Sequence, residues 1–86
     1  MPMTYKEFTK ELRDVASSLY CHKGKNRGTA AELFLKAVID TMNSENQMKG
    51  MTDAKRRNLP DDTLLDPSSE AIWKSACDEI SALVNE

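Results

Sequence analysis

The sequence predicts an all-α protein, a small bundle of three main helices plus a short fourth helix. The chain of 86 residues contains only three Gly and three Pro, fewer than the tight turns of a sheet protein usually require. Three long segments carry apolar residues at helical spacing, and a capping residue stands at the start of each. We therefore expect a single helical domain over residues 1–86, with helices at approximately 4–22, 30–46, 53–58 and 67–85.

Residues 4–22 show the clearest helical pattern. Thr4 and Glu7 form a capping box, in which each side chain satisfies a free backbone N–H at the start of the helix. The apolar positions, at about 100° per residue, make one continuous stripe: Tyr5, Phe8, Leu12, Val15, Ala16 and Leu19. We expect the helix to end near His22 or Lys23, because Gly24 can adopt the left-handed conformation that closes a helix.

The other side of this helix is divided between two charged lines. One line is basic, with Lys6, Lys10 and Arg13, and the neighbouring line is acidic, with Glu7, Glu11 and Asp14. Lines of opposite charge on one helix are typical of a solvated surface with weak ion pairs. We expect both lines to face the solvent.

Residues 30–46 predict the second helix, which Thr29 and Glu32 introduce as a capping box. Its apolar side chains cover most of the circumference: Leu33, Phe34, Leu35, Ala37, Val38, Ile39 and Met42. Two other helices are too few to cover so broad an apolar surface. We therefore predict that the protein self-associates, as a homodimer or another homo-oligomer. The predicted partner-binding residues are Leu35, Ile39 and Met42.

The remaining helices are marked by their caps. Thr52 or Asp53 can cap the short helix, and Pro60 ends it. Asp66 caps the last helix, and Pro67 suits its first turn. The apolar residues of this last helix form one inward stripe: Ile72, Trp73, Ala76, Cys77, Ile80, Leu83 and Val84.

Charge is distributed unevenly along the chain. Residues 1–58 carry eleven Lys or Arg and seven Asp or Glu, whereas residues 59–86 carry one and seven. Such asymmetry favours either a charged partner or two parts of one fold that complement each other. The acidic part can mimic a run of phosphates in a basic groove of another protein, or it can simply keep the surface soluble.

Two basic segments support the alternative function, a nucleic-acid-binding regulator. The loop 22–27 leads into a helix whose free N–H groups can hold a phosphate. We favour solvated turns for both segments, because the chain has a net charge of −2 and its glycine spacing does not match a phosphate-binding loop. The residues concerned are Lys23, Lys25 and Arg27 in the loop, and Lys55, Arg56 and Arg57 in the short helix.

Cys21 and His22 form a third and less favoured candidate, for catalysis or for a metal. Adjacent side chains on a helix point about 100° apart, which separates a thiol from the base that would activate it. The chain has one His and two Cys, so these residues and Cys77 are one ligand short of a closed zinc site. We predict no catalytic residue, no metal and no cofactor, and we expect both thiols to be free and reduced.

The sequence thus favours a role in binding rather than in catalysis. No stretch approaches the roughly 20 apolar residues that a membrane-spanning helix needs. We predict a cytoplasmic, non-enzymatic protein-interaction module, such as an adaptor, inhibitor or regulatory subunit, with a protein partner of unknown identity. Its adaptable apolar surface lies on the second helix and the methionines beside it, Met42, Met48 and Met51.

Overall fold

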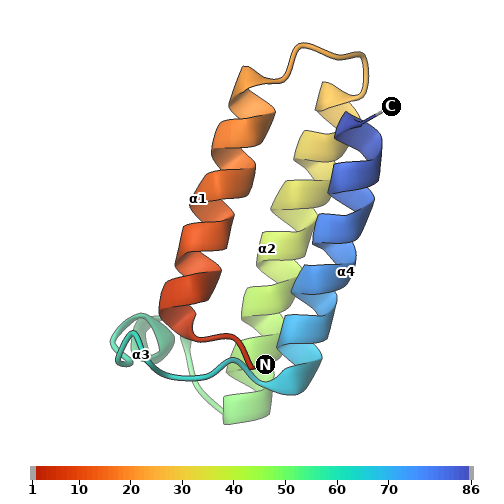
Figure 1. Ribbon diagram of the computed structural model, residues 1–86. Coiled ribbons are helices and arrows are strands. Elements are labelled where there is room, and N and C mark those ends of the chain that lie inside the picture. Colours follow the sequence, from red (N-terminus) through yellow and green to blue (C-terminus); the bar gives the residue numbers. More distant parts are fainter. Residues whose placement is uncertain (1, 86) are drawn as a thin grey trace.

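The computed structural model describes residues 2–85 and shows a small all-α bundle (Figure 1). Its helices are α1 (Tyr5–Cys21), α2 (Arg27–Lys49), α3 (Asp53–Arg57) and α4 (Pro67–Val84). The three long helices and the short fourth confirm the fold class that the helical spacing predicted.

The capping box at the start of α1 and the end of the helix near His22 are confirmed, but the expected left-handed closure by Gly24 is wrong. Glu7 N–H donates to Thr4 Oγ1 (3.2 Å), and Thr4 N–H donates to the Glu7 carboxylate (3.1 Å). At the other end the helix closes at His22, whose backbone is extended and whose N–H donates to Leu19 O (3.2 Å). Gly24 has no left-handed backbone; instead, a Cβ there would overlap the His22 imidazole, so the glycine makes room for that ring.

The second helix begins earlier than the sequence predicted. α2 starts at Arg27 with Asn26 as its N-cap residue, and Thr29 lies inside the first turn. The predicted Thr29–Glu32 capping box is therefore wrong. The Asn26 side chain donates from Nδ2 to Leu83 O (3.2 Å), which ties the start of α2 to the end of α4. α2 extends to Lys49, where Gly50 closes it with a φ of 59° in the left-handed region that favours glycine.

The caps of the last two helices are those that the sequence predicted. Thr52 Oγ1 accepts a hydrogen bond from Lys55 N–H at the start of α3 (3.3 Å). Asp66 accepts one from Ser68 N–H at the start of α4 (3.0 Å), and Pro67 occupies the first turn. These bonds satisfy N–H groups that have no partner within the helix.

Trp73 lies at the centre of the main core and is fully buried. The rings of Phe8 on α1 and Phe34 on α2 meet its indole edge to face, with centroids 5.1 and 6.2 Å away. Its Nε1–H donates to Glu11 Oε1 (2.9 Å), so the expectation that Glu11 belongs to a purely solvated line is wrong. Leu19, Ala30 and Ile80 form a second apolar cluster.

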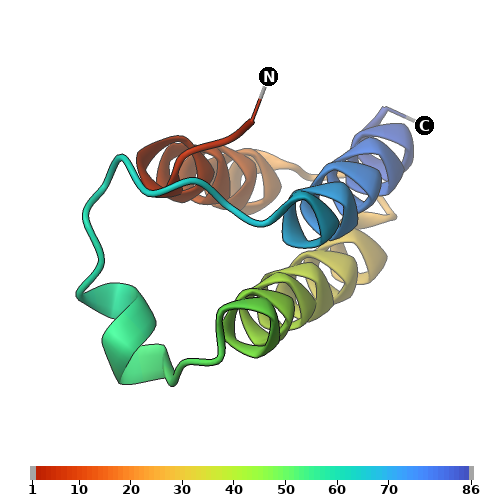
Figure 2. The same ribbon diagram turned by 90° about the horizontal axis from the view of Figure 1, so that it is seen from below.

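Three corners of the bundle hold long helices, and the fourth holds only the short α3. Seen along the bundle, α1, α2 and α4 take three corners, and α3 lies near the fourth, across from α4 (Figure 2). The segment after α3 then crosses the start of α1, where Tyr5 N–H donates to Thr63 O (2.8 Å) and Lys6 N–H to Asp61 O (2.9 Å). Because α3 has only five residues, it fills the fourth corner at one end of the bundle alone.

Candidate functional site

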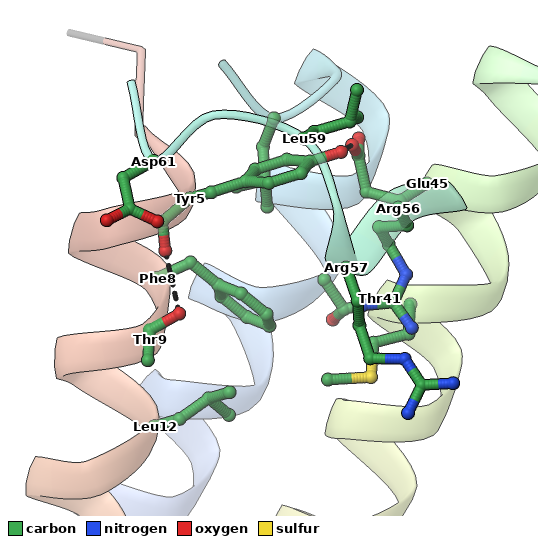
Figure 3. A pocket seen from close by; sticks show the side chains of 12 residues that line it. Tyr5, Phe8, Thr9, Leu12, Thr41, Glu45, Arg56, Arg57, Leu59 and Asp61 are labelled. Carbon is green, nitrogen blue, oxygen red and sulfur yellow. Dashed lines mark hydrogen bonds between the residues drawn. The ribbon is translucent and has the colours of Figure 1, made fainter. Parts of the chain in front are cut away.

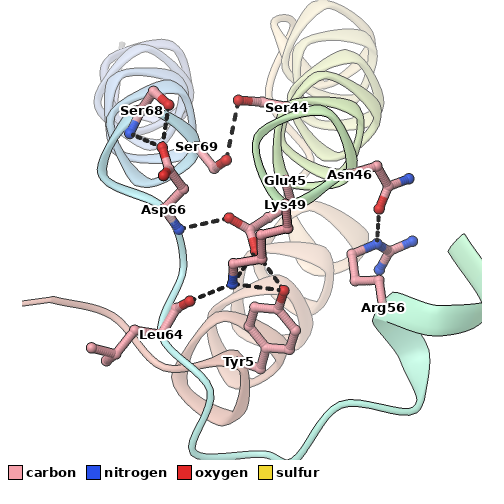
Figure 4. Close-up of polar contacts among 10 residues, drawn as sticks. All are labelled: Tyr5, Ser44, Glu45, Asn46, Lys49, Arg56, Leu64, Asp66, Ser68 and Ser69. Atoms are coloured by element: carbon pink, nitrogen blue, oxygen red, sulfur yellow. Dashed lines mark hydrogen bonds and ion pairs between the residues drawn. The ribbon is translucent and has the colours of Figure 1, made fainter. Parts of the chain in front are cut away.

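A polar network joins α1, α2 and the segment before α4 (Figure 4). Its centre is the carboxylate of Glu45, a residue that is only 2% exposed. The Lys49 ammonium lies 2.7 Å from Glu45 Oε2, and the Tyr5 hydroxyl donates to the same oxygen (2.5 Å). Asp66 N–H donates to Glu45 Oε1 (2.6 Å), and Lys49 Nζ also donates to Leu64 O (2.6 Å). The network thus holds three segments that are distant in the sequence.

These contacts keep Glu45 charged despite its burial. Burial alone raises the pKa of Glu45, but the hydrogen bonds from Lys49, Tyr5 and Asp66 N–H, together with the charge of Lys49, outweigh that effect and lower the pKa from its ordinary 4.5. Burial lowers the pKa of Lys49, but Glu45 raises it more, so the net shift is upward. Burial and the neighbouring carboxylate raise the pKa of Tyr5. At neutral pH the network therefore contains a carboxylate, an ammonium and a neutral phenol.

A cavity of about 180 Å³ adjoins this network, between α1, α2 and α3 (Figure 3). Its lining residues come from α1 (Tyr5, Phe8, Thr9, Leu12), α2 (Thr41, Met42, Glu45), α3 (Arg56, Arg57) and the following segment (Leu59, Asp61, Leu65). Thr41 is fully buried, and within residues 2–85 its hydroxyl has no hydrogen-bond partner. Buried polar groups are nearly always paired, so this hydroxyl marks a place in the wall where a donor or an acceptor is missing.

The two arginines of α3 differ in how far their charges are neutralised. Arg56 donates to Asn46 Oδ1 (3.0 Å) and forms an ion pair with Asp53 (3.1 Å). Arg57 makes one long bond, from Nε to Asp53 O (3.4 Å). Its terminal nitrogens have no hydrogen-bond partner in the part of the chain that the structure describes. Arg57 is therefore the cation at this cavity that remains available to a ligand.

The predicted partner-binding residues lie on one line along α2, and α3 contacts the lower end of this line. Leu35 and Ile39 are 61% and 57% exposed, and Met42 is half-buried in the wall of the cavity. Asn46 continues this line at helical spacing and contacts Arg56 of α3. α3 thus covers the lower part of the line and leaves its upper part open to solvent.

The two basic segments lie at opposite ends of the bundle. The loop with Lys23 and Lys25 joins α1 to α2 at one end, and α3 lies at the other (Figure 1). Lys23, Lys25 and Arg27 are all exposed, as are Lys55 and Arg57, whereas Arg56 is half-buried. The structure therefore does not join the loop and α3 into one basic surface.

Neither cysteine lines the cavity. The structure describes both as free thiols, with Cys21 exposed and Cys77 half-buried. Burial raises the pKa of Cys77 to about 11, so its thiol stays protonated at neutral pH. Among the residues described, no three His, Cys, Asp or Glu side chains are placed to hold a metal ion. In the same residues, no helix combines the length and the apolar character needed to cross a bilayer.

Several acidic residues of the last third have structural partners. Asp66 caps α4, and Glu70 lies 3.6 Å from Lys74. Glu70 also accepts a hydrogen bond from Met3 N–H (2.5 Å), which fastens the start of the chain to α4. Some of the carboxylates of this region therefore help to hold the folded structure together.

Comparisons with models of protein families, with curated proteins and with solved structures found no match. Function is therefore inferred from the surfaces and the cavity of the chain itself.

Sequence reasoning missed Glu45, Thr41 and the cavity they adjoin. A signal was present, because Phe34, Thr41 and Glu45 lie on one face of α2 at spacings of seven and four. Two polar residues on the face that also carries a core phenylalanine predict either a buried network or a binding site. The partners of Glu45 come from residue 5 and residue 66, and no local pattern connects those positions.

Proposed function

We propose that this protein is a non-enzymatic interaction module that associates through the open fourth corner of its bundle. This open corner consists of Leu35 and Ile39 on α2 and of Ala16 and Tyr20 on α1, all exposed. The observation that carries the proposal is the exposure of Leu35 and Ile39 on the line that α3 covers only at its lower end. Large apolar side chains grouped in this way are typical of interaction surfaces.

The shape of the corner suits a helix. Tyr5 and Leu12 line the cavity under α3, and Ala16 and Tyr20 continue their line along α1 at helical spacing. The open corner therefore has one wall on α1 and one on α2. A helix placed there occupies the position that a full-length fourth helix would take in a four-helix bundle.

A second copy of the chain is the occupant we propose. In a two-fold symmetric contact, one interface covers the exposed residues of both copies. Full burial of an aliphatic side chain stabilises by about 1.5–3 kcal/mol, so covering the exposed parts of Leu35 and Ile39 contributes roughly 2–3 kcal/mol per copy. Once the entropy lost on association is subtracted, this contribution fits a weak, reversible dimer.

Sedimentation equilibrium over a concentration series tests the proposal. The wild type is expected to form dimers at high micromolar concentration, and the double variant Leu35→Lys/Ile39→Lys is expected to remain monomeric. The matched control is Leu64→Lys/Ile72→Lys, which replaces two exposed apolar residues outside the corner, at 48% and 36% exposure. A wild type that stays monomeric, or a control that loses association as fully as the corner variant, contradicts the proposal.

A further inference from the structure

The cavity beneath α3 has the size of a site for one small organic molecule. Its volume of about 180 Å³ slightly exceeds the approximately 150 Å³ of an engineered protein cavity that binds benzene. Phe8 and Leu12 form its α1 side, and Met42 and Leu59 add further apolar wall. An apolar body of about the size of a benzene ring therefore fits between α1 and α2.

The charges around the cavity favour an anion. Lys49 neutralises Glu45, and Asp53 neutralises Arg56. The guanidinium of Arg57 remains outside these ion pairs, and within residues 2–85 only its Nε–H has an acceptor, Asp53 O. Asp61 is the other uncompensated charge, and Figure 3 shows it on the α1 side of the cavity, across from Arg57. A carboxylate near Arg57 thus meets a cation and lies apart from the remaining acid.

The unpaired hydroxyl of Thr41 belongs to a residue that lines the same cavity. Thr41 on α2 and Arg57 on α3 both line it, and Figure 3 draws them on the other side from Phe8 and Leu12 of α1. A hydroxyl can donate one hydrogen bond, and a carboxylate has two oxygens to accept. One carboxylate can therefore satisfy both the guanidinium and the buried hydroxyl.

From these three features we infer that the cavity binds a small monocarboxylate with an apolar body of about the size of benzoate. The carboxylate accepts hydrogen bonds from Arg57 and Thr41, and the apolar body packs against Phe8 and Leu12. Charge-assisted bonds from a guanidinium select for the anion, while the volume between the apolar side chains limits its size. This site is separate from the open corner, so either proposal can fail without the other.

Titration of the ¹⁵N-labelled protein with benzoate, followed by NMR, tests the inference. Benzoate is expected to shift the signals of residues around the cavity, with a Kd on the order of 1 mM for so small a ligand. Benzamide has nearly the same shape without the charge, and it is expected to bind about tenfold more weakly or less. Equal binding of the two compounds, shifts confined to other parts of the molecule, or no binding at about 20 mM would each overturn the inference.

Variants at Arg57 and Thr41 test the assigned contacts. Arg57→Gln is expected to weaken benzoate binding about tenfold, whereas Lys55→Gln, which removes an exposed cation of the same helix outside the cavity, leaves binding unchanged. Thr41→Val keeps the volume but lacks the hydroxyl, so a loss of about fivefold is expected, and Thr41→Ser retains most of the affinity. Thermal unfolding of each variant confirms that it is folded. Wild-type affinity in folded Arg57→Gln would overturn the inference.

Discussion

The two ends of the bundle are built on different principles. At the end with the loop between α1 and α2, Leu19, Ala30 and Ile80 bring three helices into direct apolar contact. At the end with α3, the hydroxyl of Tyr5 on α1 donates to the buried carboxylate of Glu45 on α2, so a polar contact joins these helices. The cavity adjoins this polar contact.

The two ends of the bundle also differ in which interactions stabilise them and in how much unpartnered surface they leave for binding. The loop end gains its stability from apolar contact, which does not depend on protonation. The α3 end depends on charged partners that must all be present, because a buried carboxylate is stable only while it is hydrogen-bonded. The proposed cavity lies at the α3 end, where the Thr41 hydroxyl has no partner among the residues described. The open corner continues from there along α1 and α2 as far as Tyr20, near the loop.

Trp73 lies at the centre of the main core, and its loss is expected to have the largest effect. Trp73→Ala removes the ring contacts to Phe8 and Phe34 together with the bond to Glu11. The expected decrease in the free energy of unfolding is about 3–5 kcal/mol, measured by urea denaturation. Trp73→Phe, which retains most of the apolar contact, should lose clearly less. A decrease below about 1 kcal/mol for Trp73→Ala would show that the core does not depend on this side chain.

Glu45→Gln tests the polar end directly. The substitution keeps the shape of the side chain but removes the charge that Lys49 and Tyr5 contact. Bonds to charged groups contribute about 1.5–3 kcal/mol, so we expect a loss of about 2 kcal/mol in denaturation at neutral pH. A variant as stable as the wild type would mean that the network does not hold α1 against α2.

The pH dependence of the same variant sharpens the comparison. The folded state lowers the pKa of Glu45 from 4.5, so the charged carboxylate stabilises the folded protein at pH values above 4.5. This stabilisation is lost as the pH falls from 4.5 through the lower pKa of the folded state. The difference in the free energy of unfolding between wild type and Glu45→Gln is therefore expected to shrink below pH 4.5. Comparing the two proteins removes the contributions of the other carboxylates, since Asp53 and Asp66 also have lowered pKa values. A difference that does not change with pH would contradict this prediction.

Ala30→Leu tests the apolar end, where there is no space for a larger side chain. Ala30 is completely buried between Leu19 and Ile80, so the added atoms must push the helices apart. We expect a loss of about 1–2 kcal/mol, with the same value at pH 4 and pH 7 within about 0.5 kcal/mol. The control is Ala82→Leu on the exposed side of α4, which should change stability by less than about 0.5 kcal/mol. Equal effects of the two substitutions would show that the loop end is not tightly packed.

The smallest effect is expected for the basic loop. Lys23, Lys25 and Arg27 are exposed, and no ion pair within residues 2–85 involves them. Replacing all three by Ala should change the free energy of unfolding by less than about 0.5 kcal/mol and leave self-association unaltered. If the wild type binds DNA or RNA at micromolar concentration in about 0.15 M salt and the triple variant does not, the nucleic-acid function would replace the one proposed here.

The local features of this protein could be predicted from its sequence. The caps at Thr4, Thr52 and Asp66 involve backbone groups two or three residues away, so their spacing is visible in the chain. The apolar stripe with Trp73 depends on helical periodicity alone. The breadth of apolar residues on α2 likewise predicted that some would remain uncovered, as Leu35 and Ile39 do.

The tertiary structure decided the features that depend on distant partners. α2 begins at Arg27 where the Asn26 side chain meets the end of α4, 57 residues further along the chain. Glu45 is buried because Tyr5, 40 residues earlier, and the backbone of Asp66 both donate to it. The cavity likewise depends on distant partners, because its lining residues come from α1, α2, α3 and the segment that follows α3. Periodicity specifies which residues share a helix face, but only the packed bundle determines which groups meet across it and which are left without a partner.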